Sequence, residues 1–85
     1  MKLPVIKHLI QFVDENDADY IVETIAVLEH LCELESLKEE ELDVIAELIS
    51  NMYGAIEVNK MIKEGKDKKT ALNDFMKRVL GAIDK

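Results

Sequence analysis

The sequence predicts an all-α fold, a four-helix bundle-like domain, and three observations lead to this prediction. Leu, Ile, Val, Ala, Glu and Lys dominate the 85 residues, and most of these residue types favour helix. With 3 Gly and 1 Pro, few positions can interrupt one. Apolar residues recur every three or four positions, and no run alternates as a half-buried strand would. We therefore expect a single helical domain over residues 1–85, with helices at about 4–13, 18–34, 37–64 and 68–83.

The first two helices have clear start signals. Pro4 suits the first turn of a helix, where its missing N–H is not needed. Asp17 is a good N-cap for the second helix. The segment 18–34 is apolar around most of its circumference, which indicates burial on several sides.

The third helix is the longest. Ser36 and Glu39 have the spacing of a capping box, and Gly65 is a natural C-terminal cap. Gly54 lies in the interior, so the sequence leaves open whether this helix is continuous or kinked there. Asp67 is the expected N-cap of the fourth helix, which carries a single apolar stripe.

The two central helices carry more apolar surface than the two terminal helices can cover. Since large exposed apolar patches are rare on monomers, we expect a homo-oligomer, with a two-fold dimer as the first choice. The alternative is that a kink at Gly54 folds the third helix back and buries the excess within one chain. The residues expected at the interface are Ile25, Leu28, Cys32, Ile45, Ile49, Asn51, Met52, Tyr53, Gly54 and Ile56.

One polar stripe on the third helix has three open interpretations. Ser50, Asn51, Gly54 and Glu57 line up along one side of an otherwise apolar helix. The stripe could contact a partner helix and fix its register, as buried Asn does in coiled coils. It could instead face solvent, or bind a small ligand.

Charge is unevenly distributed along the chain. The formal net charge is -7, yet residues 14–57 carry fourteen carboxylates against Lys38 alone. The acidic run 39–43 could dock a protein partner with a basic surface, although the helix dipole alone explains it. The basic cluster Lys60–Lys69 offers weak nucleic-acid binding as an alternative, which the negative net charge and the lack of interleaved aromatics disfavour. Docking of this cluster on acidic residues, within or between chains, is the favoured interpretation.

A metal site is the second alternative. Glu29, His30 and Glu33 lie close together on the second helix, and Glu47 on the third could join them. The di-iron bundle signature needs Glu three residues before His, where Val27 stands. We therefore favour a solvated polar face and expect no metal, no cofactor and no catalytic residue; the protein is not expected to be an enzyme.

The sequence also bears on location. No stretch approaches the roughly 18 apolar residues of a membrane span. Pro4 and Lys7 interrupt the N-terminal apolar run, which is therefore not expected to act as a signal peptide. Cys32 is the only cysteine, as is typical of a reducing compartment. We expect a cytoplasmic protein that does not associate with membranes.

The chain resembles known families in three segments: Val27–His30, Val44–Met52 and Asn73–Leu80. Together with the helix that follows Ser36, they are similar to a small family of uncharacterised, all-helical bacterial proteins of the Bacteroidetes. Residues 22–83 resemble, more faintly, the YejL-like proteins, and that resemblance implies a helical dimer. Neither family implies a catalytic residue.

The surplus apolar surface of the two central helices predicts a self-associating or protein–protein interaction protein, acting as an adaptor or regulatory subunit.

Overall fold

The computed structural model describes residues 2–83, with side chains described as far as Val79, and this part of the chain contains four α-helices and no strand. The helices are α1 (Leu3–Glu15), α2 (Ala18–Leu31), α3 (Glu39–Lys63) and α4 (Lys68–Ile83). The predicted all-α fold with four helices is confirmed.

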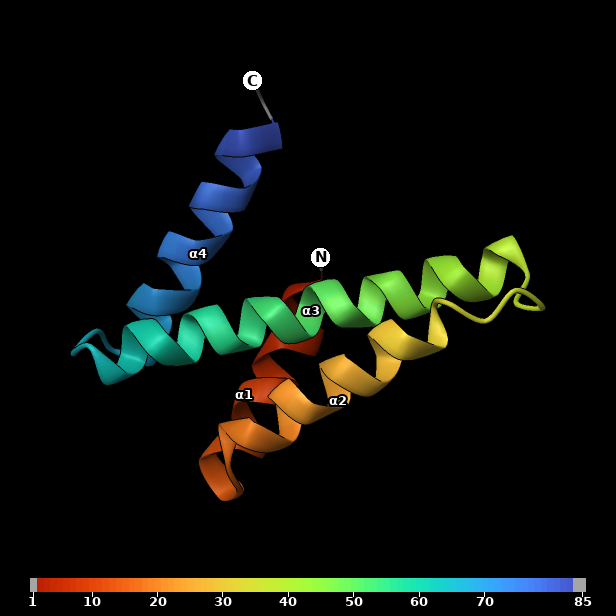
Figure 1. Ribbon diagram of the computed structural model, residues 1–85. Helices are drawn as coiled ribbons and strands as arrows, with labels where there is room; N and C mark the ends of the chain where they lie inside the picture. Colours follow the sequence, from red (N-terminus) through yellow and green to blue (C-terminus); the bar gives the residue numbers. More distant parts are fainter. Residues whose placement is uncertain (1, 84–85) are drawn as a thin grey trace.

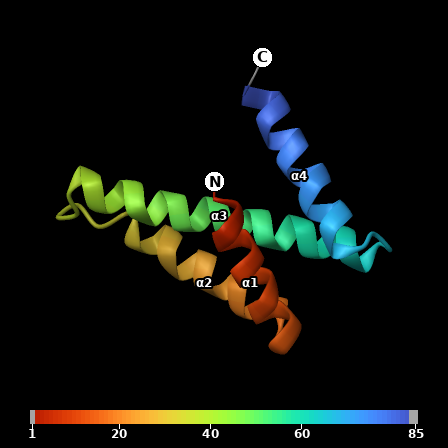
Figure 2. The ribbon, with the colours of Figure 1, turned by 180° about the vertical axis from the view of Figure 1, so that it is seen from behind.

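α3 is the central element of the fold. Figure 1 shows α2 beside the N-terminal half of α3 and α4 leaving its C-terminal end in another direction. α1 crosses α3 on the face seen in Figure 2. The molecule measures 43 × 35 × 17 Å, so its thinnest dimension holds only two helix layers. Its radius of gyration is 13.8 Å, against about 12 Å for a compact domain of this length. The bundle is therefore open and flat.

Two apolar clusters hold the helices on α3. The larger joins α1, α3 and α4 and consists of Ile6, Ile10, Ala55, Val58, Ala71, Leu72 and Phe75. The smaller joins the end of α1 to α2 and α3 through Val13, Ile21 and Ile25. Burial of an aliphatic side chain contributes roughly 1.5–3 kcal/mol, so the first cluster supplies most of the apolar stabilisation.

Two helix boundaries differ from the prediction. α2 ends at Leu31 rather than at residue 34, because Glu33 and Leu34 donate to carbonyls three residues back and tighten the chain into turns. α3 begins at Glu39, and its N-cap is Lys38, so the predicted Ser36 cap is wrong. The Lys38 N–H donates to the Glu41 carboxylate at 2.9 Å, which is the glutamate half of a capping box shifted by two residues.

The other end signals are confirmed. Asp17 accepts a hydrogen bond from the Asp19 N–H, and Asp67 accepts one from the Thr70 N–H at 2.7 Å. Gly65 has φ +112°, a conformation that favours glycine. The N–H groups of Gly65 and Lys66 donate to the carbonyls of Ile62 and Met61, the two bonds of a Schellman cap.

α3 is continuous through Gly54, so the alternative in which a kink there folds the helix back is wrong. Gly54 instead permits close packing. A Cβ at this position would lie 3.1 Å from Phe75 and 3.2 Å from Ile6. The missing side chain therefore lets α1 and α4 approach α3 at the same point.

Candidate interaction surface

The polar stripe on α3 is occupied by contacts within the chain. Asn51 is 1% exposed; its Oδ1 accepts the Lys2 backbone N–H at 2.9 Å, and its Nδ2 donates to the Glu47 carbonyl at 2.8 Å. Gly54 is buried against Ile6 and Phe75. This stripe is therefore where α1 and α4 attach to α3.

Most of the other residues expected at a dimer interface lie where α2 meets α3. Ile25 is buried, and Ile49, Met52 and Ile56 pack against its cluster. Leu28, Cys32 and Ile45 are half-buried. Tyr53 is exposed and donates through its hydroxyl to Glu29 on α2 at 3.1 Å, a bond that raises the pKa of Tyr53. Much of the surface of these residues is therefore used inside one chain.

An exposed apolar patch lies on the same side of the α2–α3 pair as α1, beyond the part that α1 covers. On α3, Asn51, Ala55 and Val58 share one helical face and pack under α1. Leu48 and Val44 continue this face toward the start of α3, at three and seven residues before Asn51. They are 40% and 60% exposed, because α1 begins opposite Asn51 and does not reach them.

α2 supplies the other half of the patch. The Tyr20 ring stacks edge-on against Phe12 of α1 at 5.9 Å, which places this face of α2 on the α1 side. Val27 and Leu31 continue the same face, seven and eleven residues after Tyr20, and are 60% and 40% exposed. We call Val27, Leu31, Val44 and Leu48 the uncovered patch. Sequence reasoning missed it, because periodicity shows that a helix has a surplus apolar face but not where a crossing helix stops.

The exposed area of the whole chain agrees with an incomplete core. Its accessible surface is 6109 Å², about 1000 Å² above the roughly 5100 Å² expected for a compact protein of 9.7 kDa. The excess reflects the open, flat arrangement of the four helices.

The acidic residues considered as metal ligands do not converge. Glu29, His30 and Glu33 are exposed, and Glu29 accepts the Tyr53 hydroxyl. Among residues 2–83, no three His, Cys, Asp or Glu side chains are placed to hold a metal ion. Cys32 is a free, half-buried thiol.

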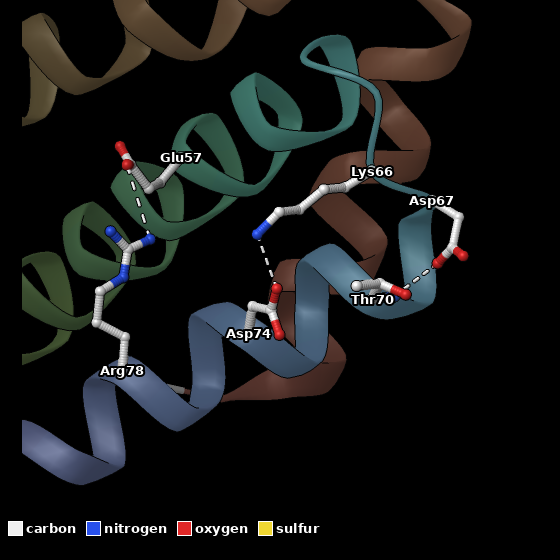
Figure 3. Close-up of polar contacts among 6 residues, drawn as sticks. All are labelled: Glu57, Lys66, Asp67, Thr70, Asp74 and Arg78. Carbon is white, nitrogen blue, oxygen red and sulfur yellow. Dashed lines mark hydrogen bonds and ion pairs between the residues drawn. The ribbon is translucent and has the colours of Figure 1, made fainter.

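Two lysines of the basic cluster Lys60–Lys69 pair with acidic residues of the same chain, and Figure 3 shows one of these pairs. Lys66 pairs with Asp74 at 2.8 Å, and Arg78 lies 3.8 Å from Glu57. Lys68 pairs with Asp14 of α1 at 2.5 Å. The Lys66 ammonium lowers the pKa of Asp74. All these groups are partly exposed, so solvent screens each pair and weakens it.

Within the described part of the chain, no helix is long and apolar enough to cross a membrane.

Comparison with known proteins places the chain in a family. No curated protein and no solved structure matches the chain significantly. A family model described as "Family of unknown function (DUF6952)" matches residues 1–84. The match bears on neither the Bacteroidetes origin nor the YejL-like resemblance, which stay predictions. The chain therefore belongs to the DUF6952 family, whose function is unknown.

Proposed function

We propose that this protein is a self-associating helical interaction protein, and that a second copy packs on the uncovered patch. The observation that carries the proposal is the continuity of the α3 face, which is buried under α1 at Ala55 and Val58 and bare at Leu48 and Val44. A face that is core along one half of a helix and exposed along the other lacks a covering element.

The open fold leaves surface available for a second copy. The chain exposes about 1000 Å² more than a compact protein of its mass, and a standard protein interface buries about 800 Å² on each partner. A two-fold axis through the patch would place Val44 and Leu48 of one protomer against the same residues of the other, or against Val27 and Leu31. Two α2–α3 pairs would then form four packed helices.

Charge predicts how this association responds to salt. The patch lies in the acidic part of the chain, with Glu40, Glu41 and Glu47 nearby on α3. Two copies that meet through it bring like charges together, so screening by added salt favours the dimer. A partner with a basic surface, the alternative occupant, would instead bind more weakly as salt rises.

The proposal assigns no catalytic reaction to the protein. Its adaptor or regulatory role would follow from what the assembled dimer presents on its outer faces. The lone thiol of Cys32 supports a place in the reducing cytoplasm.

The test is the molar mass of the protein in solution at two salt concentrations. Light scattering after size exclusion, at tens of micromolar, should give twice the chain mass of 9.7 kDa. The dimer fraction should rise between about 50 mM and 500 mM NaCl, since the Debye length falls with ionic strength. A mass of one chain at both salt concentrations would contradict self-association.

A further inference from the structure

A groove lies between α1 and α4, away from the uncovered patch. Its volume is about 590 Å³, within the range of small-molecule sites. The aliphatic side chains of Leu3, Ile10 and Leu72 form its floor. Ile10 and Leu72 are core residues, so the floor is fixed by the packing of the fold.

The rim of the groove is cationic. Lys7 of α1 and Lys68 and Lys69 at the start of α4 line it, together with the amides of Gln11 and Asn73. On α1, Leu3, Lys7 and Ile10 follow helical spacing. On α4, Lys68 and Leu72 do so as well. Two helix faces therefore turn the same combination of aliphatic and ammonium groups toward one space.

The charge in this groove is opposite to that of the protein as a whole. The chain has a net charge of -7, yet three ammonium groups gather here. Asp14 neutralises Lys68 at 2.5 Å. Within residues 2–83, Lys7 and Lys69 have no ion-pair partner. The Gln11 amide donates to the Glu15 carboxylate at 3.4 Å.

We infer that this groove binds a small anionic amphiphile: a single aliphatic chain that ends in a carboxylate or phosphate. The chain would lie on Leu3, Ile10 and Leu72. The oxyanion would pair with the ammonium groups of Lys7 and Lys69 and accept hydrogen bonds from the amides of Gln11 and Asn73. No residue of the uncovered patch lines the groove, so this inference and the proposed self-association can fail independently.

Isothermal titration calorimetry with decanoate and with decyl phosphate, both below micelle-forming concentrations, tests the inference. Decanoate or decyl phosphate should bind with a dissociation constant below 1 mM at one site per chain, and the tighter of the two identifies the head group. Decanol, which has the same chain and no charge, should bind at least tenfold more weakly. Octanoate should bind about fourfold more weakly than decanoate, since each half-buried methylene contributes roughly a factor of two.

Charge reversal locates the site. Lys7→Glu with Lys69→Glu should weaken binding at least tenfold, whereas Lys60→Glu, an exposed lysine of α3 outside the groove, should change it less than twofold. Far-UV circular dichroism checks folding, and Lys7→Gln with Lys69→Gln replaces the charge-reversed pair if that variant unfolds. The inference is overturned if neither amphiphile binds below 1 mM, if decanol binds as tightly, if the Lys60 variant loses binding equally, or if only anionic vesicles are bound.

Discussion

The backbone N–H of Lys2 and the side-chain oxygen of Asn51 are hydrogen-bonded at 2.9 Å, across 49 positions of sequence. This bond ties the N-terminal end of α1 to the middle of α3. It also marks where covered surface ends on α3, because Leu48 and Val44 lie just beyond it on the same face. One buried amide therefore lies both at the start of α1 and at the boundary of the uncovered patch.

Replacement of Asn51 by Ala should destabilise the fold. The variant loses the acceptor for Lys2 and the bond to the Glu47 carbonyl, so we expect the free energy of unfolding to fall by about 1–2 kcal/mol. Urea denaturation measures it. Ser50→Ala, the neighbouring position, should change the stability by less than about 0.5 kcal/mol. Equal stability of the Asn51 variant and the parent would show that the bond contributes nothing.

Asn51→Leu separates two roles of this residue. Asn51 is buried within one protomer, so we expect the Leu variant to lose stability and to keep the molar mass of the parent. A change of mass would mean that Asn51 fixes the register between chains instead.

Gly54→Val should be strongly destabilising. Even a Cβ would approach Phe75 and Ile6 to 3.1–3.2 Å, and both neighbours belong to the larger core cluster. We expect a loss of about 2 kcal/mol or more in the free energy of unfolding, despite the better helix propensity of Val. Ala46→Val, on the exposed side of α3, is the matched control and should lose only about 0.5 kcal/mol. Similar losses for both variants would exclude close packing at Gly54.

The bond between Tyr53 and Glu29 predicts a shifted ionisation. The Glu29 carboxylate accepts the Tyr53 hydroxyl and raises its pKa above the usual value of about 10. The folded state therefore holds this proton more tightly, so the contribution to stability is present below pH 10 and is lost as pH rises through the folded pKa. Tyrosinate absorbance should show that Glu29→Gln lowers the pKa of Tyr53, whereas Glu33→Gln leaves it in place. An unchanged titration in the Glu29 variant would contradict the contact.

The cap of α4 predicts a dependence on acid pH. The Thr70 N–H donates to Asp67 and lowers the pKa of this carboxyl. Its contribution to stability is therefore present above the ordinary carboxyl pKa of about 4 and is lost as pH falls through the lower folded value. Asp67→Ala should lower the melting temperature at pH 7, with a difference that shrinks at acid pH. Asp67→Asn, which keeps an accepting oxygen but no charge, should melt between the parent and the Ala variant; a loss equal to that of Ala would point to charge alone.

Sequence reasoning captured the features of the fold that depend on local chemistry. Pro4, Asp17, Gly65 and Asp67 all act at helix ends as predicted, because caps depend on a few neighbouring residues. The start of α3 was displaced, since Glu41 competes with the expected Ser36 and Glu39 pair for the same role. The role of Asn51 could not be found, because its partner lies 49 positions away and helical periodicity carries no information on crossing points.

The most direct test of the central claim compares two valines on α2. Val27 is in the uncovered patch and Val22 is on another face of the same helix, and they are 60% and 51% exposed. Light scattering at equal concentrations should give a dimer mass for the parent and for Val22→Glu, and the 9.7 kDa chain mass for Val27→Glu with Val44→Glu. Dimers that survive in the Val27 and Val44 variant, or that are lost equally in the Val22 variant, would contradict an interface at this patch.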